Sequence, residues 1–102
     1  MDEAREKKTT IDHEQIRRWV RDRGGRPAHV KGTEHHDDQA GLLRIELPGH
    51  VGGETLEAIQ WDEFFRRFEE SALAFLYEEE TESGRPSRFH RLISRRSLQG
   101  RE

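Results

Sequence analysis

Two stretches of the chain carry apolar residues at the three- and four-residue spacing of an amphipathic helix. The first runs from residue 13 to residue 23, and the second begins near Trp61 and contains three phenylalanines. Other stretches alternate apolar and polar residues, or are continuously apolar over a few residues, which is typical of strands. The pattern therefore predicts two helices, and strands at PAHVKG, GLLRIELPG, LAFLYEEE and SRFHRLIS.

The start of the first helix has three independent signals. Asp12 is a favourable N-cap, and Gln15, three residues later, completes a capping box. Ile11 and Ile16 occupy the two positions of a hydrophobic staple. Gly24 supplies a stop, so we expect the helix to end just before it.

The strands predict an antiparallel sheet. In GLLRIELPG, Leu43 and Ile45 alternate with Arg44 and Glu46, so one face points to the core and the other to solvent. This strand can pair with PAHVKG across the loop GTEHHDDQAG. LAFLYEEE is apolar on both faces over its first half, as expected for a central strand, and a turn at Ser83-Gly84 returns the chain as a hairpin.

These elements predict an α+β fold, a single small domain in which two amphipathic helices pack on one face of a mostly antiparallel sheet, with the C-terminal hairpin at its centre. We expect a disordered arm over residues 1–9, the domain over residues 10–95 and a loose tail over residues 96–102. The predicted core consists of Ile16, Trp19, Val20, Leu43, Ile45, Ile59, Trp61, Phe64, Phe68, Leu73, Phe75 and Phe89.

Charge divides the chain into three parts. Residues 1–32 carry nine Lys or Arg and six Asp or Glu, residues 33–84 carry three and fourteen, and residues 85–102 carry six and one. Basic ends can pair with the acidic centre inside the fold, or they can present arginines to an anionic partner. We favour the first interpretation, and the second stays open.

Several function classes lack their sequence signals. The chain contains no cysteine, which removes disulfides, thiolate zinc sites and a cysteine nucleophile. The first ten residues lack the apolar segment of a secretory signal, and no apolar run approaches the ~20 residues of a membrane span. We therefore expect a cytoplasmic protein with no membrane partner. No glycine-rich phosphate loop or nucleophile elbow is present, so we predict neither a cofactor nor a catalytic residue.

The histidine- and aspartate-rich loop raises the question of a metal site. His35, His36, Asp37 and Asp38 offer suitable ligand atoms, but adjacent residues do not easily converge on one ion, and the H-x3-H pair of a helical site is missing. We interpret the loop as solvated and predict no metal site.

Most of the chain, roughly residues 9–95, resembles a family of small bacterial proteins of about this length. The resemblance rests on TIDHEQIRRWVRDRGGRPAHVKGT, on GLLRIELPG and on LEAIQWDEFFRRFEESALAFLYEEETESGRPSRFHRLISR, of which WDEFF, LAFLY and the following SRF hairpin are the most specific parts. Some members carry the name 1,4-alpha-glucan branching enzyme. The resemblance implies a common fold unit and a bacterial origin.

Glucan branching itself is not expected of this chain. The reaction needs two carboxyl groups about 5 Å apart over a sugar-binding cleft, and branching enzymes build it on a barrel of about 250 residues. The chain has 102 residues, and Asp62 and Glu63 are neighbours on a helix that point about 100° apart. Trp19 and Trp61 could stack on a sugar, but both lie on stripes that the core needs. A glucan partner is therefore not favoured.

Three functional hypotheses remain. The leading one is a non-catalytic binding or interaction module with a protein partner. The second is a nucleic-acid-associated protein that uses an arginine-rich face, and the third is the carbohydrate-related role. The candidate residues of the anion- or nucleic-acid-binding face are Arg17, Arg18, Arg21, Arg26, Arg88, Arg91 and Arg95.

Overall fold

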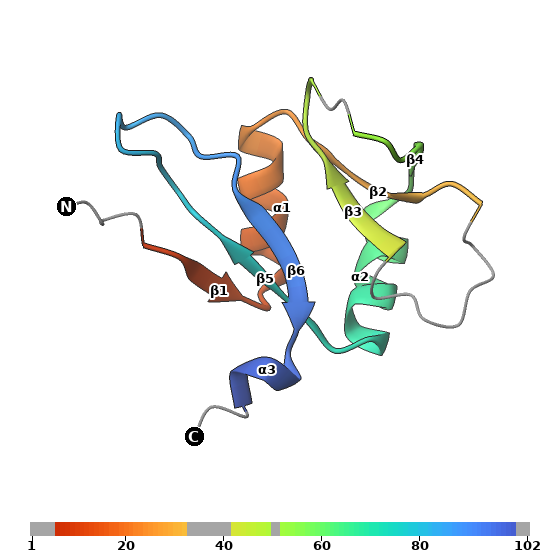
Figure 1. Ribbon diagram of the computed structural model, residues 1–102. Helices are drawn as coiled ribbons and strands as arrows, with labels where there is room; N and C mark the ends of the chain where they lie inside the picture. Colours follow the sequence, from red (N-terminus) through yellow and green to blue (C-terminus); the bar gives the residue numbers. More distant parts are fainter. Residues whose placement is uncertain (1–5, 33–41, 50–51, 100–102) are drawn as a thin grey trace.

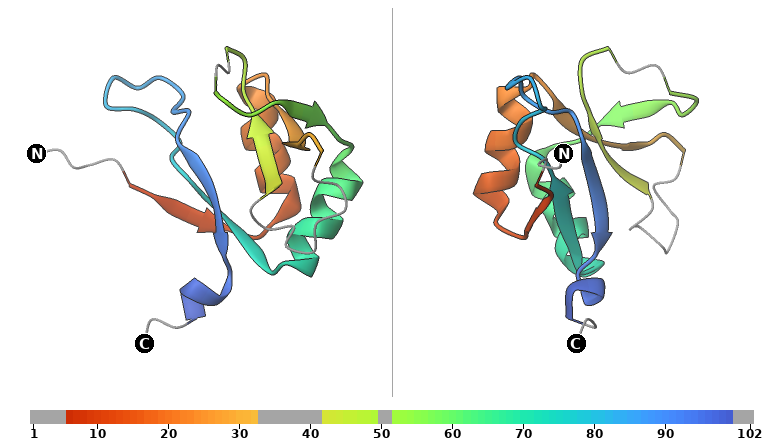
Figure 2. Two further views of the ribbon diagram at one scale, coloured as in Figure 1. Left: turned by 45° about the vertical axis from the view of Figure 1, so that its right-hand side comes forward. Right: turned by 60° about the vertical axis from the view of Figure 1, so that its left-hand side comes forward.

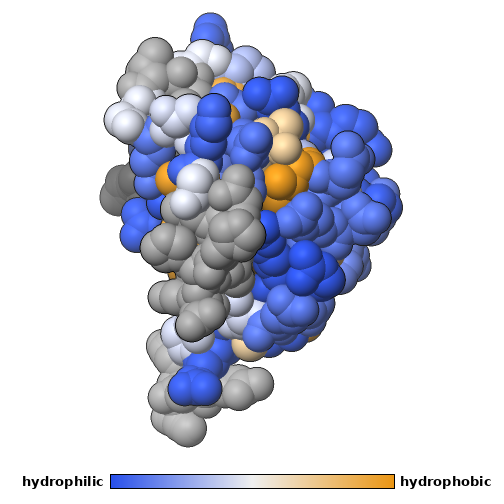
Figure 3. All heavy atoms as spheres, turned by 90° about the vertical axis from the view of Figure 1, so that its right-hand side faces the viewer, coloured by the Kyte–Doolittle hydropathy of each residue, from blue (hydrophilic) through white to orange (hydrophobic). Residues whose placement is uncertain are grey.

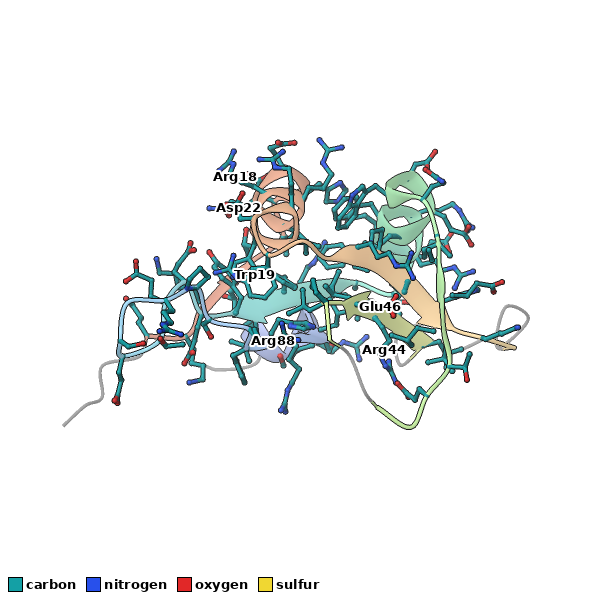
Figure 4. All side chains as sticks on the ribbon, turned by 90° about the horizontal axis from the view of Figure 1, so that it is seen from above. Arg18, Trp19, Asp22, Arg44, Glu46 and Arg88 are labelled. Carbon is teal, nitrogen blue, oxygen red and sulfur yellow. The ribbon has the colours of Figure 1, made fainter. Side chains whose placement is uncertain are left out.

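The computed structural model describes residues 6–32, 42–49 and 52–99 (Figure 1). In chain order the elements are β1 (Lys8–Thr10), α1 (His13–Asp22), β2 (Arg26–Val30), β3 (Leu43–Glu46), β4 (Leu56–Ala58), α2 (Trp61–Glu70), β5 (Leu73–Tyr77), β6 (His90–Ser94) and α3 (Arg96–Gln99). The α+β prediction is confirmed. Both long helices lie on the same side of the strands, α1 over β5 and α2 over β2 and β3 (Figure 4).

The strands form two sheets, whereas the sequence predicted one. One sheet has the order β1-β5-β6 and the other the order β3-β2-β4, and every pairing is antiparallel. The two sheets lie beside each other with β3 and β6 at their adjoining edges (Figures 1 and 2). The pairing of β2 with β3 and the central position of β5 were predicted correctly. The division of the strands into two sheets could not be predicted from the sequence, because it depends on which strand edges meet in the folded chain.

Both predicted ends of the chain contain more structure than expected. Lys8 and Thr9, assigned to a disordered arm, form β1 with Thr10 and pair with β5. Residues 96–99, assigned to a loose tail, form the short helix α3. Strand β4 was missed, because its sequence runs directly into α2. The two strands form through hydrogen bonds to neighbours that the local sequence does not reveal, whereas α3 is held by local bonds to Ser94 and Arg95.

Helix α1 begins where the sequence predicted, but its cap has another arrangement. The Asp12 carboxylate accepts hydrogen bonds from the backbone N–H groups of Glu14 and Gln15 at 2.9 and 3.3 Å. The Gln15 side chain does not reach back to the Asp12 N–H. It accepts a hydrogen bond from the Thr10 hydroxyl at 2.6 Å, and the Asp12 N–H donates to that same hydroxyl oxygen. Ile11 stays 47% exposed, so any stapling contact that it makes buries little of it.

The turn between α1 and β2 needs both of its glycines. Gly24 has a φ of +71°, in the left-handed region that glycine adopts without strain. At Gly25 an added Cβ would lie 2.6 Å from the Leu47 side chain and 3.0 Å from the Glu46 carbonyl oxygen. The second glycine therefore lets β3 approach the end of α1.

Most of the predicted core is buried, with three exceptions. Ile59 and Trp61 are partly buried against the core. Phe89 is wrong as a core residue, because the even-numbered positions of β6 face the core. Its ring lies instead under the Lys7 ammonium, 4.9 Å from the ring centroid. The core cluster also contains Leu47, Phe65 and Tyr77, beside the predicted Ile16, Trp19, Val20, Leu43, Ile45, Phe64, Phe68, Leu73 and Phe75.

Helix α1 holds the β5–β6 hairpin through side-chain bonds to backbone carbonyls. The Trp19 indole N–H donates to the Glu78 carbonyl at 2.9 Å. The Arg23 guanidinium donates to the carbonyls of Ser87 at 2.6 Å, Glu79 at 2.8 Å and Trp19 at 2.9 Å, and it lies 4.0 Å from the Trp19 ring. Burial lowers the pKa of Arg23 from its usual value, and the nearby Glu79 and Asp22 oppose this effect. We call Trp19 and Arg23 the hairpin clamp.

Helix α2 is connected to the second sheet by a polar chain around His29. The Arg67 guanidinium donates to His29 Nδ1 at 3.3 Å, so the proton of this ring is on Nε2, which donates to the Glu57 carboxylate at 2.9 Å. Arg67 also pairs with Glu63 at 2.5 Å. His29 and Arg67 are buried, and each finds its partners within this chain.

The hairpin clamp predicts a large effect of Arg23→Ala. Its loss removes three hydrogen bonds to carbonyls, although Glu79 keeps the Ser87 N–H as a donor, so we expect the free energy of unfolding to fall by about 2–4 kcal/mol. Arg18→Ala is the matched control, because Arg18 is an exposed arginine of the same helix, and it should change stability by no more than about 0.5 kcal/mol. Urea unfolding followed by circular dichroism measures both, and equal effects would show that the clamp does not stabilise the hairpin.

Candidate functional site

A groove of about 250 Å³ lies between the two sheets. It is lined by three residues of β3 and three residues at the start of β6. β3 and β6 are the adjoining edges of their sheets and do not pair with each other. The lining residues are Leu43, Arg44, Ile45, His90, Arg91 and Leu92. We call this feature the inter-sheet groove.

The β6 side of the groove presents backbone groups that have no backbone partner among the described residues. The Phe89 carbonyl accepts from the Glu78 N–H, and the Arg95 N–H donates to the Ala72 carbonyl, so the odd-numbered residues direct their backbone groups to β5. Because these groups alternate in direction along a strand, those of His90 and Leu92 point away from β5. The outward N–H and C=O groups of these two residues therefore face the groove.

The β3 side is partly blocked. Ile45 lies opposite Pro27, whose carbonyl accepts from Ile59 on the β4 side, so the backbone groups of Ile45 point to the free edge of β3. The Arg44 guanidinium donates a hydrogen bond to the Leu43 carbonyl at 2.9 Å. The His90 ring reaches the backbone of Ile45. Covering an edge in this way is how native proteins prevent unwanted strand pairing, and it leaves β6 as the open side.

His90 forms the floor of the inter-sheet groove. Its ring centroid lies 5.4 Å from that of Trp19 and 6.1 Å from that of Phe75, and its Nδ1–H donates to the Arg88 carbonyl at 3.0 Å. Burial lowers the pKa of His90 from 6.5, although the backbone groups of Arg88 and Ile45 act in the opposite direction. The floor is therefore uncharged at neutral pH.

The seven arginines of the predicted anion-binding face do not share one surface. Arg18 projects from α1 on one side of the sheets, whereas Arg88 lies on the other side (Figure 4). Arg17 and Arg21 line a separate groove of about 460 Å³ together with Trp61.

Several of these arginines already have partners. Arg17 pairs with Glu14, and Arg26 pairs with Glu46 at 2.8 Å. Arg88 donates to the Pro48 carbonyl at 2.9 Å. Only Arg88 and Arg91 lie at the inter-sheet groove, one beside its end and one in its lining.

Ion pairs connect the basic ends to the acidic centre, as we favoured from the sequence, but not everywhere. Lys7 pairs with Glu78 at 2.8 Å, and Arg95 lies 3.2 Å from Glu69. Within residues 6–32, 42–49 and 52–99, neither Arg88 nor Arg91 has a carboxylate oxygen within 4.0 Å. In that part of the chain, no ion pair joins a glutamate of one arm of the hairpin to an arginine of the other.

The other candidate chemistries from the sequence find little support. His35, His36, Asp37 and Asp38 lie outside the described residues. The described residues contain no group of three His, Asp or Glu side chains that could hold a metal ion. Trp19 is only 4% exposed, so it cannot stack on a sugar.

Sequence reasoning missed the inter-sheet groove. It placed Leu43 and Ile45 in the core, which is correct for their side chains. It gave no sign that the backbone edge of β6, on the other side of the groove, stays open. His90 was noted only as a histidine in the returning strand. No local pattern distinguishes an edge strand from a paired one, so this site requires the tertiary structure.

A surface cluster joins both long helices to the end of β6. His13 Nε2–H donates to the Glu69 carboxylate at 2.7 Å, and its ring stacks on Phe65 at 3.9 Å. Arg95 donates to the Leu73 carbonyl at 3.0 Å, and its Nη2 approaches Glu69 at 3.2 Å as an ion pair without an aligned hydrogen bond. The hydrogen bond from His13 lowers the pKa of Glu69; burial opposes this, and Arg95 reinforces it.

The lowered pKa of Glu69 predicts a stability that depends on pH. Its ionised form is favoured in the folded state, so the contribution is present above the unfolded value of about 4.3 and is lost as the pH falls through the folded pKa. Because Glu69 is 45% exposed, we expect only about 0.2–1 kcal/mol. Glu69→Gln should lower the free energy of unfolding at pH 7 and have no effect near pH 2.

The control for this measurement is Glu70→Gln. Glu70 is the neighbouring carboxylate and contacts only Arg66 of its own helix, at 3.4 Å. Urea unfolding at several pH values compares the two variants. If Glu69→Gln and Glu70→Gln gave parallel pH profiles, the His13–Glu69–Arg95 cluster would not be the cause.

Comparisons with known proteins do not name a family for the chain. None of the helices in the described ranges combines the length and the apolar character that are needed to cross a membrane. No protein-family model, curated protein or solved structure matches the chain. The functional assignment therefore depends on the geometry of the candidate site.

Proposed function

We propose that the protein is a non-catalytic interaction module that binds an extended segment of a partner protein in the inter-sheet groove. The segment adds as a strand to the free edge of β6. The observation that carries this proposal is the direction of the His90 and Leu92 backbone groups, which point into the groove instead of toward β5. In strand addition, main-chain hydrogen bonds supply affinity and alternate side chains supply specificity.

The shape of the site supports a strand as the ligand. A volume of about 250 Å³ lies below the roughly 300–1,000 Å³ of pockets that enclose small molecules. Leu92, which is only partly buried, offers an apolar contact to an added strand, whereas the Leu43 and Ile45 side chains belong to the core. The side that carries α2 and β2–β4 is mostly hydrophilic, with small separate apolar patches among its described residues (Figure 3). Backbone pairing therefore suits this molecule better than docking on a broad apolar face.

Blocking the β6 edge is the first test. Random 12-residue peptides are selected against the protein, and their dissociation constants are measured by fluorescence anisotropy. We expect Leu92→Pro to weaken binding about tenfold or more, because proline removes the outward N–H that the ligand needs. Proline is tolerated on an edge strand where the N–H points away from the sheet, so the fold should persist.

The control for the edge variant is Leu92→Ala, which removes the same side chain but keeps the N–H. It should weaken binding clearly less than Leu92→Pro does, because it loses only the apolar contact and keeps the backbone hydrogen bond. A second measurement leaves the protein unaltered: N-methylation of the peptide, one residue at a time, should abolish binding at every second position only. The proposal would be overturned if no binding peptide were selected, or if the selected peptides still bound after N-methylation at every position.

Titrations of the same protein distinguish the nucleic-acid and carbohydrate hypotheses from the interaction module. Amide chemical shifts are recorded during titrations with a DNA duplex, a single-stranded RNA and glucan oligosaccharides. Salt-sensitive shifts on residues 17–26 would favour the nucleic-acid hypothesis, because phosphate contacts depend strongly on salt. Quenching of Trp61 fluorescence by glucan would favour the carbohydrate hypothesis. Peptide-induced shifts at His90 and Leu92 support the interaction module.

A further inference from the structure

We infer that the segment bound in the inter-sheet groove is acidic, with two carboxylates about three residues apart and an apolar residue between them. This inference rests on the proposed function and names the chemistry of its partner. The carboxylates meet Arg88 and Arg91, and the apolar residue meets the lining of the groove.

Two cations at the groove are available to a ligand. Arg91 is exposed, and its guanidinium lies 6.0 Å from the centroid of the Phe89 ring. Arg88 is exposed as well, and its bond to the Pro48 carbonyl holds it beside the point where β3 has ended. Within the described part of the chain, no carboxylate oxygen lies within 4.0 Å of either one. Both can therefore accept a carboxylate from outside.

The opposite rim does not add free charge. Arg44 lines the β3 side of the groove, but its guanidinium is held by both carboxylate oxygens of Glu54, at 2.9 and 2.7 Å. The floor is the uncharged His90 ring. Positive charge available to a ligand is thus concentrated on the β6 side, where Arg88 and Arg91 are three residues apart, or about 10 Å along an extended chain.

The middle of the groove favours an apolar side chain. Leu43 and Ile45 are buried on the β3 side, and Leu92 is partly buried on the β6 side. A charged side chain placed against the exposed part of Leu92 would lose hydration without gaining a partner. The ligand that fits is therefore an extended acidic, apolar, acidic segment.

The groove fits a peptide better than a nucleic acid. A phosphate chain is rich in acceptors, whereas the β6 edge presents the carbonyls of His90 and Leu92 beside their N–H groups. An extended peptide carries donors and acceptors in the same alternation, so it satisfies both. The phosphates of a nucleic acid, which carry only acceptors, would leave these carbonyls without donors.

The test uses the selected peptides and their charge variants. Replacing both acidic residues of a peptide, Glu→Gln, should weaken binding about 3- to 30-fold at low salt, and the loss should shrink as salt increases. The double variant Arg88→Glu with Arg91→Glu should bind these acidic peptides more weakly and their Glu→Lys versions more tightly. Fluorescence anisotropy measures the dissociation constant in each case at about 50 and about 300 mM salt. These concentrations lie on either side of the one at which the electrostatic screening length is roughly 10 Å.

The matched control is Arg85→Glu with Arg96→Glu. It changes the net charge equally through two exposed arginines that do not line the groove, and it should bind like the unchanged protein. Peptides that bind equally well after Glu→Gln would overturn the acidic ligand and leave strand addition intact. No binding peptide at all would overturn both. A single-stranded RNA that displaces the peptide and depends on Arg88 and Arg91 would show that the anion is a nucleic acid.

Discussion

The position of the C-terminal hairpin depends on one arginine and one tryptophan of α1. Arg23 and Trp19 lie one turn apart on the same helix and donate to hairpin carbonyls that belong to both arms, at Glu78, Glu79 and Ser87. Because both arms are bound, β6 can neither slide along β5 nor turn its edge. The β5–β6 pairing decides the direction in which the His90 and Leu92 backbone points, and the hairpin clamp holds this hairpin against α1, which positions one wall of the inter-sheet groove.

The other wall depends on α2. Helix α2 connects to β2 through Arg67 and His29, and β2 carries β3 by hydrogen bonds. Helix α2 also packs on β5, so the two sheets share a core on the side of the helices, and their adjoining edges need not pair. Arg44 and the His90 ring cover the β3 edge, which also prevents the two sheets from joining directly. A groove between two strand edges is the result of this arrangement.

The uneven charge of the chain has two uses in the fold. Some basic residues of the ends neutralise the acidic centre, as Lys7 does at Glu78 and Arg26 does at Glu46. These pairs are partly exposed and contribute modestly to stability. Arg88 and Arg91 take no part in this neutralisation, and they lie at the inter-sheet groove. The basic residues that neutralise the acidic centre therefore differ from the two arginines at the inter-sheet groove.

The sequence by itself determined the two helices, the central strand and nearly all of the core, because spacing, caps and glycines act over a few residues. The Asp12 cap and the Gly24 stop are local in this sense. Only the tertiary structure decided that the strands form two sheets, that Phe89 turns away from the core, and that the predicted arginines separate. Edges, strand parity and surface clusters depend on contacts between residues far apart in the chain, which no local pattern records.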